Sequence, residues 1–194
     1  MVHRNVNLIF EIYRSPQSVF TLKELAVLIG ETDEDRLKSK VNYHIKKGRM
    51  IALRRGIYAK EKYNPLELAN KIFVPSYISL ETVLQEAGVN FQYYKTIFVV
   101  SYLSREIKIN DHIVRYRKIQ DRILSHPLGI RQENGYAIAT PERAFLDALY
   151  IYKTYHFDKL DGLNVDLVFS LIQNVYTSEK IRERAEKLLG RKNV

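Results

Sequence analysis

The sequence predicts an α+β fold in two parts, and three observations lead to this prediction. Apolar residues recur at helical spacing over the first third of the chain. Further along, an Asn134-Gly135 pair separates two short runs of strand-forming residues, which is a strong signal for a β-hairpin. Apolar residues make up 46% of the 194 residues, an ordinary fraction for a globular protein and enough to bury a core. We therefore expect a helical N-terminal part and a sheet-containing C-terminal part.

The N-terminal part is predicted to begin with two short helices. The first should span residues 3–14, and Pro16 should end it because proline disfavours helical angles in the residue before it. The side chains expected to face inward are Val6, Ile9, Phe10 and Tyr13. Thr21 should begin the second helix as its N-cap, in a capping box with Glu24. Gly30 should end this helix.

A third helix should follow, with Thr32 or Asp33 as its N-cap and Gly48 at its end. The acidic residues 33–35 favour the positive N-terminal end of the helix dipole. Apolar residues repeat every four positions and should face the core; they are Leu37, Val41 and Ile45. The opposite half of the helix carries polar and basic side chains; these are Arg36, Ser39, Lys40, Asn42, Tyr43, Lys46 and Lys47.

A β-hairpin is predicted directly after the third helix. Two short apolar strands, residues 50–53 and 57–59, flank the basic turn Arg54-Arg55-Gly56. Three helices followed by such a hairpin make a winged helix-turn-helix, which we expect over residues 1–62. In this kind of domain the third helix enters the major groove of DNA, and the hairpin contacts a phosphate or the minor groove.

The distribution of charge supports the same interpretation. Residues 36–62 contain ten Lys or Arg and one acidic residue, while the whole chain has 31 basic and 22 acidic residues, so the rest sums to zero. A local surplus of this size indicates a polyanionic partner, although a solvated basic surface is the alternative. With the predicted elements it favours double-stranded DNA over RNA or a protein. The residues expected to contact DNA are Arg36, Ser39, Lys40, Asn42, Tyr43, Lys46, Lys47, Arg49, Arg54 and Arg55.

Residues 63–194 are predicted to form an α+β domain with a small antiparallel sheet and flanking helices. The expected strands span residues 94–102, 107–109, 112–119, 130–133 and 136–139. The expected helices span residues 65–73, 80–87, 165–175 and 178–189, with a further helix beginning at Thr140-Pro141. Ser79 should cap the helix that begins at residue 80. Leu188 should lie on the buried side of the last helix, and Arg115 and Arg117 should share one face of their strand.

Several classes of function are not favoured by the sequence. There is no Cys, which excludes disulfides and thiolate metal sites and fits a reducing cytosol, and the five His are scattered. No apolar run approaches a membrane span, so we expect a cytoplasmic protein. Glu106 and Lys108 match half of a nuclease metal site, but no carboxylate lies on a neighbouring predicted strand. We expect no catalytic site, metal or cofactor.

Three stretches of the chain together resemble the antitoxins of AbiE abortive-infection systems, which are type IV toxin–antitoxin systems that include transcriptional regulators of viral-defence loci. The stretches are residues 55–58 (RGIY), 75–88 (PSYISLETVLQEAG) and 138–149 (IATPERAFLDAL). They lie in the family's order and span nearly the whole chain. Thr82, Val83 and Arg143 depart from the residues that are frequent in the family.

The resemblance implies a repressor that binds inverted repeats in its own promoter through the winged helix. It also implies a C-terminal domain that opposes a co-encoded nucleotidyltransferase-like toxin, in many members without a stable complex. The residues that it singles out in this domain are Ser76, Tyr77, Ser79, Glu81, Glu142, Arg143 and Asp147. The alternative is that these residues have only a structural role and hold the helices of the domain against its sheet. This alternative is supported by Arg143 and Asp147, which are an i,i+4 pair, and by Glu142, which suits the start of a helix.

Two other hypotheses about the whole chain stay open at this point. In one, the C-terminal domain of a winged-helix regulator serves effector binding or assembly and has no antitoxin role. In the other, the chain is a DNA-processing enzyme that the winged helix directs to its substrate. The sequence leaves open the operator, the toxin, and whether the protein is a monomer or a dimer that binds DNA cooperatively.

Overall fold

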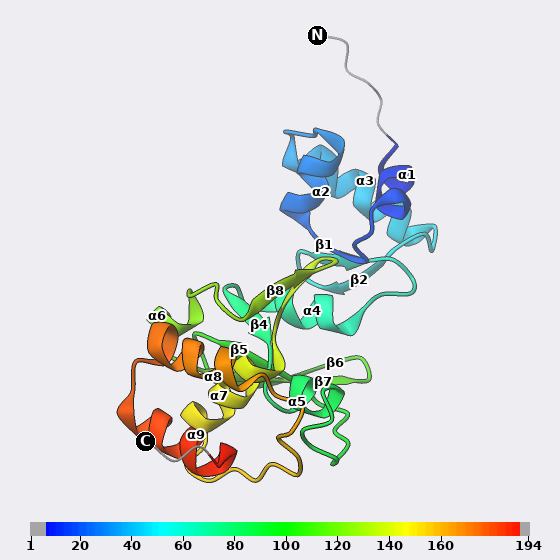
Figure 1. Ribbon diagram of the computed structural model, residues 1–194. Helices are drawn as coiled ribbons and strands as arrows, with labels where there is room; N and C mark the ends of the chain where they lie inside the picture. Colours follow the sequence, from blue (N-terminus) through cyan, green and yellow to red (C-terminus); the bar gives the residue numbers. More distant parts are fainter. Residues whose placement is uncertain (1–6, 191–194) are drawn as a thin grey trace. The chain divides into compact units, whose positions relative to one another are not determined.

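The computed structural model describes residues 7–190, and the chain divides after Ile72 into two compact units (Figure 1). The expected domain boundary, between residues 62 and 63, lies before this division. The elements of the N-terminal unit are α1 (Leu8–Arg14), β1 (Val19–Thr21), α2 (Leu22–Ile29), α3 (Glu34–Lys46), β2 (Ile51–Arg54), β3 (Ile57–Ala59) and α4 (Pro65–Ile72). The three strands form an antiparallel sheet in the order β1-β3-β2.

Local capping signals set the ends of α2 and α3 as the sequence predicts. The Thr21 hydroxyl accepts a hydrogen bond from the Glu24 amide, and the Glu24 carboxylate accepts one from the Thr21 amide, which completes the capping box. Gly30 ends α2 in the left-handed conformation. Asp33, not Thr32, caps α3, because its carboxylate accepts from the amides of Asp35 and Arg36.

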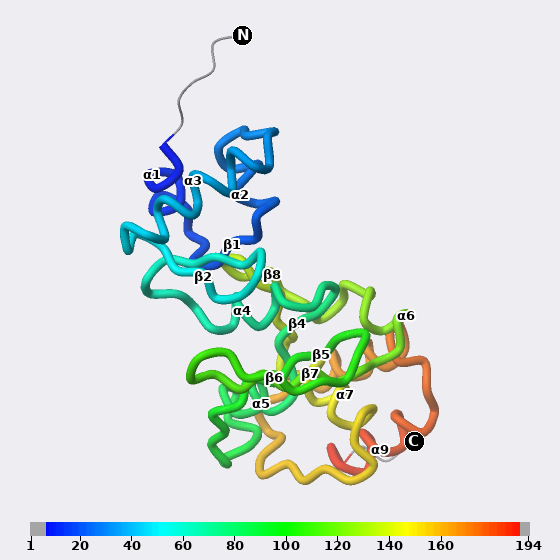
Figure 2. Tube along the Cα trace, turned by 180° about the vertical axis from the view of Figure 1, so that it is seen from behind, coloured from blue at the N-terminus to red at the C-terminus, as the bar shows by residue number. Residues whose placement is uncertain are grey.

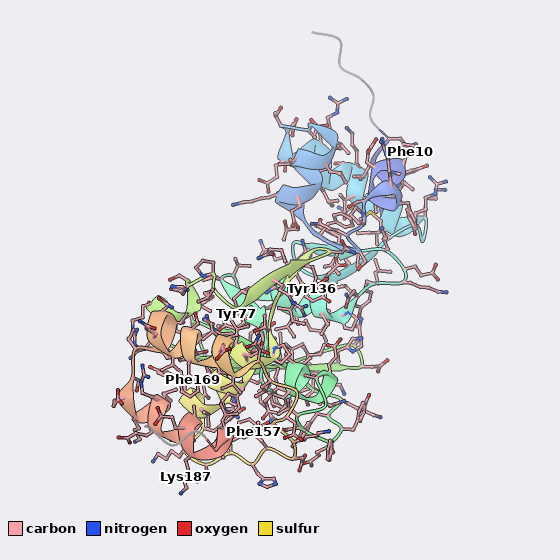
Figure 3. The ribbon with its side chains drawn as sticks, in the orientation of Figure 1. Phe10, Tyr77, Tyr136, Phe157, Phe169 and Lys187 are labelled. Atoms are coloured by element: carbon pink, nitrogen blue, oxygen red, sulfur yellow. The ribbon has the colours of Figure 1, made fainter. Side chains whose placement is uncertain are left out.

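The predicted inward face of α1 is wrong for Phe10 and Tyr13, whereas Ile9 is partly buried and packs against the core. Asn7 caps the helix, so α1 begins at Leu8, and its buried residues are Leu8 and Ile12, one turn apart. Phe10 is 62% exposed and Tyr13 is also exposed, while Val6 lies outside the described residues. Figure 3 shows Phe10 pointing away from the N-terminal unit. Both stripes of this helix are apolar, and periodicity alone does not tell which one meets the core.

The core of the N-terminal unit joins its three predicted helices to the hairpin. Its buried members are Leu8, Ile12, Phe20, Leu25, Ile29, Leu37, Val41 and Met50. Ile45 and Tyr58 are partly buried and pack against this cluster. The core thus fixes α3 through its apolar side and leaves the opposite side free for solvent or a ligand.

Glu67 joins α4 to β1, an edge strand that sequence analysis missed. The Glu67 side chain is almost fully buried, and its carboxylate accepts from the backbone amides of Ser18 and Val19, both at 2.8 Å, and from the Ser18 hydroxyl at 2.9 Å. The Ser18 hydroxyl in turn accepts from the Asn64 amide at 2.8 Å. These bonds explain why α4, although expected in the C-terminal domain, belongs to the first unit.

The C-terminal unit is built on a larger sheet than the sequence predicts. Its elements are β4 (Ser76–Ile78), α5 (Glu81–Glu86), β5 (Ile97–Ser101), β6 (Arg105–Ile109), β7 (His112–Lys118), α6 (Asp121–Leu124), β8 (Ile130–Glu133), β9 (Tyr136–Ala139), α7 (Pro141–Ile151), α8 (Val165–Leu171), the π-helical turn η1 (Ile172–Tyr176) and α9 (Glu179–Leu189). The six strands have the order β6-β7-β5-β4-β9-β8.

The prediction of a small antiparallel sheet in this unit is therefore wrong, because the sheet is six-stranded and mixed. The predicted hairpins β6–β7 and β8–β9 are confirmed, but β5 pairs in parallel with β7, and β4 pairs in parallel with β9. The missed strand β4 lies between β5 and β9 and so joins the two halves of the sheet. A hairpin signal identifies only strands that follow each other in sequence, which is why the parallel pairs were not predicted.

Helix α7 occupies the centre of the C-terminal unit. Thr140 caps it and Pro141 begins it, as predicted, and the expected inward residues Ala144, Phe145, Ala148 and Leu149 are all buried. It packs against α5, α8 and α9, and α7, α8 and α9 lie on one face of the sheet (Figures 1 and 2). Two expectations for neighbouring helices are wrong. Leu188 is exposed on α9, and Ser79 does not cap α5, because its hydroxyl bonds to α7 instead.

We predict that Glu67→Ala destabilises the N-terminal unit. The substitution leaves the Ser18 and Val19 amides without their acceptor, and a hydrogen bond to a charged group contributes about 1.5–3 kcal/mol. We therefore expect the free energy of unfolding to fall by roughly 2 kcal/mol or more in a urea titration. Glu61→Ala, at an exposed position, is the control and should change it by less than about 0.5 kcal/mol. Equal stabilities of the two variants would contradict the role given to Glu67.

Candidate functional site

The outward side of α3 is polar and accessible. Leu37 and Val41 are buried on its inner side, whereas Ser39, Asn42 and Tyr43 are exposed on the other. Tyr43 is 52% exposed, and its ring meets the His44 ring edge-on, with 5.1 Å between the ring centroids. His44 is half-buried, as its place beside the apolar stripe predicts, and burial together with nearby Arg49 lowers its pKa.

Acidic side chains neutralise the cations in the first half of α3. Lys40 Nζ lies 2.7 Å from Glu31 Oε2, and Arg36 Nε lies 3.6 Å from the same oxygen. Lys38 Nζ lies 2.6 Å from the Glu34 carboxylate and 3.6 Å from that of Asp35. Two of the residues expected to contact DNA, Arg36 and Lys40, are thus already engaged with an acid.

Among the described residues, no acidic side chain neutralises the cations in the second half of α3 and directly after it. Lys46, Lys47 and Arg49 are exposed, and within residues 7–190 none of their side chains forms an ion pair. Lys47 Nζ lies 5.9 Å from the centre of the Tyr43 ring, a cation–π distance that orients both side chains. Cations at a helix C-terminus are favoured by the helix dipole, so they need no acidic partner for stability.

The hairpin between β2 and β3 adds two further cations. Arg54 pairs with Ile57 across the strands, which leaves Arg55 and Gly56 as a two-residue turn. Gly56 has a φ of 77°, a left-handed angle that glycine adopts without strain. The Gly56 carbonyl accepts from the Leu22 amide at 3.1 Å, which fastens the turn to the start of α2. Arg54 and Arg55 are exposed and, in the part of the chain that the structure describes, form no ion pair.

Five exposed cations in two groups, three at the C-terminal end of α3 and two at the hairpin, are together called the cationic end: Lys46, Lys47, Arg49, Arg54 and Arg55. All belong to the set expected from the sequence to contact DNA. Not every cation of the basic segment is equally available, because Lys60 Nζ donates to the Ser15 carbonyl at 2.7 Å. Chemically, the cationic end offers hydrogen-bond donors and positive charge to phosphates, and Lys46 and Lys47 lie on the same helix as the exposed neutral side chains of α3.

Four of the candidate residues in the C-terminal unit meet in its core. The Asp147 carboxylate accepts from the hydroxyls of Tyr77 at 3.1 Å and Ser79 at 2.8 Å. Arg143 Nε lies 3.7 Å from Asp147 Oδ1. Both charged side chains are 0% exposed. Figure 3 places Tyr77 inside the C-terminal unit.

Sequence analysis missed a fifth member of this cluster, Tyr176. Its hydroxyl donates to Asp147 Oδ1 at 2.7 Å, across 29 positions in the sequence. Because no local motif links η1 to α7, no signal in the sequence pointed to this contact. We call Tyr77, Ser79, Arg143, Asp147 and Tyr176 the buried cluster.

The surroundings of the buried cluster hold the Arg143 guanidinium in place. Its two terminal nitrogens donate to the carbonyls of Leu128 at 2.7 Å and Ile123 at 2.6 Å. The rings of Tyr77 and Tyr176 lie 5.5 and 5.4 Å from its central carbon. Burial raises the pKa of the Asp147 carboxyl, and the guanidinium and three hydroxyl donors oppose that shift. The arrangement joins α7 to β4, η1 and the segment before β8, as the structural interpretation of these residues predicts.

The other three candidates in this unit lie apart from the cluster. Ser76 is opposite Ser101 in the sheet. The Glu81 carboxylate accepts from the Tyr152 hydroxyl at 3.4 Å, and burial raises the pKa of Glu81. Glu142 accepts from the Asn164 amide at 3.0 Å, which fixes the start of α8. The seven residues singled out by resemblance do not form one accessible site.

Arg115 and Arg117, expected on one face of β7, have specific partners. Arg115 donates to Glu106 at 2.7 Å and lies over the Phe98 ring. Arg117 lies over the Tyr152 ring at 5.7 Å. Both side chains are partly buried, so they pack on the sheet and do not form a free cationic surface.

Comparisons with known proteins leave the family open. No protein-family model matches the sequence, and no curated protein matches it. Across residues 7–190, His, Asp and Glu side chains are nowhere grouped in threes or more in a way that could hold a metal ion. In the same range, no helix has both the length and the apolar character needed to cross a lipid bilayer.

We predict that Asp147→Ala strongly destabilises the C-terminal unit. Removing one partner of a buried ion pair leaves the other charge uncompensated, which costs about 3–5 kcal/mol. Arg143→Ala should act similarly, and the double variant should lose less stability than the sum of the two. Denaturant unfolding measures all three, with the exposed Asp161→Ala as the control. Additive losses would show that the two side chains do not act as a pair.

Proposed function

We propose that this chain is a sequence-specific DNA-binding repressor of its own promoter and the antitoxin of an AbiE-like toxin–antitoxin system. The N-terminal unit serves in this proposal as a winged helix-turn-helix, with α3 as the recognition helix and the β2–β3 hairpin as the wing. One observation carries the DNA-binding proposal. Five cations lie at the C-terminal end of α3 and at the hairpin turn, and within the described residues none has an acidic partner.

Two kinds of contact follow from the side chains on this surface. Ser39, Asn42 and Tyr43 are neutral hydrogen-bonding groups in the middle of the exposed side of α3, where they can reach base edges in the major groove. The cationic end contacts phosphates, which fixes the position of the helix but carries no sequence information. Affinity then comes mainly from the cations, and discrimination comes from the neutral residues.

The antitoxin part of the proposal rests on the resemblance of residues 55–58, 75–88 and 138–149 to the AbiE antitoxins. Burial of several of the residues in these stretches limits which side chains can contact a toxin. Tyr77, Arg143 and Asp147 are buried, so their role is to maintain the fold. Opposition to a toxin therefore uses exposed residues of the unit or acts without a stable complex. The alternative, in which this unit serves effector binding or assembly, requires no toxin at all.

For the DNA-binding surface we predict the effect of Arg54→Ala combined with Arg55→Ala. Each phosphate contact contributes about 0.9 to the slope of log K against log salt, so losing two contacts should reduce the slope by about 2. Fluorescence anisotropy with the duplex upstream of the chain's own gene, titrated over a range of KCl concentrations, measures this slope. Affinity should fall for that duplex and for a scrambled duplex alike.

A matched control distinguishes the effect of losing the hairpin arginines from the effect of lowering the net charge of the protein. Arg105→Ala with Arg131→Ala removes the same charge from exposed positions in the C-terminal unit. This variant should keep the wild-type slope. An equal change of the salt slope in both variants would contradict phosphate contact by the hairpin. Wild-type protein that binds neither duplex at low salt would contradict the proposed DNA binding.

The antitoxin proposal predicts a separation of two activities in cells. If a nucleotidyltransferase-like protein is encoded beside this chain, its expression should slow growth, and co-expression of the wild-type chain should restore growth. The Arg54→Ala and Arg55→Ala variant, expressed from an unrelated promoter, should still restore growth but should no longer repress a reporter under the native promoter. A wild-type chain that represses the reporter without restoring growth would favour the effector or assembly alternative.

A further inference from the structure

The carboxylate of Glu31 forms ion pairs with two cations, Arg36 and Lys40, at the start of the proposed DNA-binding side of α3. Glu31 lies in the turn between α2 and α3, and its Oε2 is 2.7 Å from Lys40 Nζ and 3.6 Å from Arg36 Nε. Its Oε1 accepts from the Asp33 amide at 3.4 Å. The Glu31 side chain is only 11% exposed, so its position is set by the surrounding turn.

The stripe that Glu31 controls continues along the helix. Arg36, Lys40, Tyr43 and Lys47 are separated by four, three and four positions, which places them along one line of an α-helix. Glu31 neutralises part of the charge at the beginning of this line, whereas Lys47 at its end lies over the Tyr43 ring. Glu31 therefore lowers the net charge at the start of this line from +2 to +1, whereas the charge of Lys47 is not reduced by an ion pair within the described residues.

A second acid on the same helix provides a natural comparison. Glu34 lies 2.6 Å from Lys38, but its side chain is 68% exposed and Lys38 lies towards the flank of the apolar stripe. An exposed pair of this kind contributes little and is easily exchanged for water or salt. Glu31 and Glu34 carry the same charge, but only Glu31 holds residues on the proposed DNA-binding side.

We propose that Glu31 sets the ratio of specific to non-specific DNA binding by withholding Arg36 and Lys40 from phosphates. The proposal rests on the DNA-binding function proposed above. Phosphate contacts strengthen binding to every sequence, whereas specificity is the difference in affinity between the operator and other sequences. A fixed carboxylate that occupies two cations lowers the affinity shared by all sequences and leaves the base contacts of Asn42 and Tyr43 in place.

Glu31 stays charged under the conditions in which DNA binds. The hydrogen bond from Lys40 lowers the pKa of the Glu31 carboxyl, and Arg36 acts in the same direction. The carboxylate also repels phosphates that approach this end of α3. Both effects direct the phosphate backbone towards the cationic end.

The test compares Glu31→Gln with Glu34→Gln on two duplexes, one from upstream of the chain's own gene and one of the same length with a scrambled sequence. Anisotropy over a range of KCl concentrations gives the salt slope for each. In Glu31→Gln, the release of Arg36 and Lys40 should steepen the slope on the scrambled duplex by about 1–2. The affinity ratio between the two duplexes should fall severalfold. Glu34→Gln removes the same charge and should keep the wild-type slope and ratio.

A second variant tests the same point without replacing Glu31. Arg36→Gln combined with Lys40→Gln should reduce the slope by clearly less than the drop of about 2 expected for two free phosphate contacts, since Glu31 withholds the two cations from phosphates. Combined with Glu31→Gln, it should cancel the steepening, as expected for residues that act as one unit. A large loss of slope in the Arg36 and Lys40 variant, or equal slopes for Glu31→Gln and wild type, would overturn this inference while leaving the proposed function intact. Wild-type protein that binds neither duplex would instead remove the proposed function.

Discussion

An α-helix is stabilised by acidic groups at its first turn and by cations at its last, and this constraint separates charge along α3. Asp33 caps the helix, and Glu34 and Asp35 occupy its first turn. Lys46 lies in its last turn, and the chain then runs through Arg49 into the hairpin. Within residues 7–190 these cations have no acidic partner, and the dipole stabilises those at the helix end, so they remain available to a ligand. The same distribution of charge that stabilises the helix therefore creates the surface on which the proposed DNA binding depends.

A different constraint governs the C-terminal unit. Arg143 and Asp147 are fully buried, and a buried charge is tolerated only when it is paired and hydrogen-bonded. The hydroxyls of Tyr77, Ser79 and Tyr176 meet this demand at the carboxylate, and backbone carbonyls meet it at the two terminal nitrogens of the guanidinium, whose Nε has, within the described residues, only the ion pair with Asp147. The polar residues of the stretch from 138 to 149 thus have a structural explanation.

Much of the fold could be predicted from short-range signals. The capping box at Thr21, the Asn134-Gly135 turn and the Thr140-Pro141 helix start each involve residues within a few positions of one another, and the structure confirms all three. The strands β1 and β4 were missed because each has only three residues and is defined by partners far away in sequence. The mixed character of the large sheet was missed for the same reason.

The candidate DNA interface, too, could be predicted only where it depends on residues close together in the sequence. Helical geometry places Arg36, Lys40 and Lys47 on the outer side of α3, and the structure confirms that they lie opposite Leu37 and Val41. Geometry within the helix does not reveal that Glu31, in the preceding turn, binds two of these cations. Whether a cation is free to bind a ligand thus depends on tertiary contacts, whereas the side of the helix on which it lies follows from the sequence.

The short connection between β2 and β3 has a further consequence. Only Arg55 and Gly56 form it, and the bond from the Leu22 amide to the Gly56 carbonyl holds it against α2. The backbone at this point has little conformational entropy left to lose, so Arg55 gives up mainly its own rotamers on meeting a ligand. A longer loop with the same arginines would have to be ordered during binding. In the proposed complex with DNA, preorganisation of this turn therefore favours tight binding as much as its charge does.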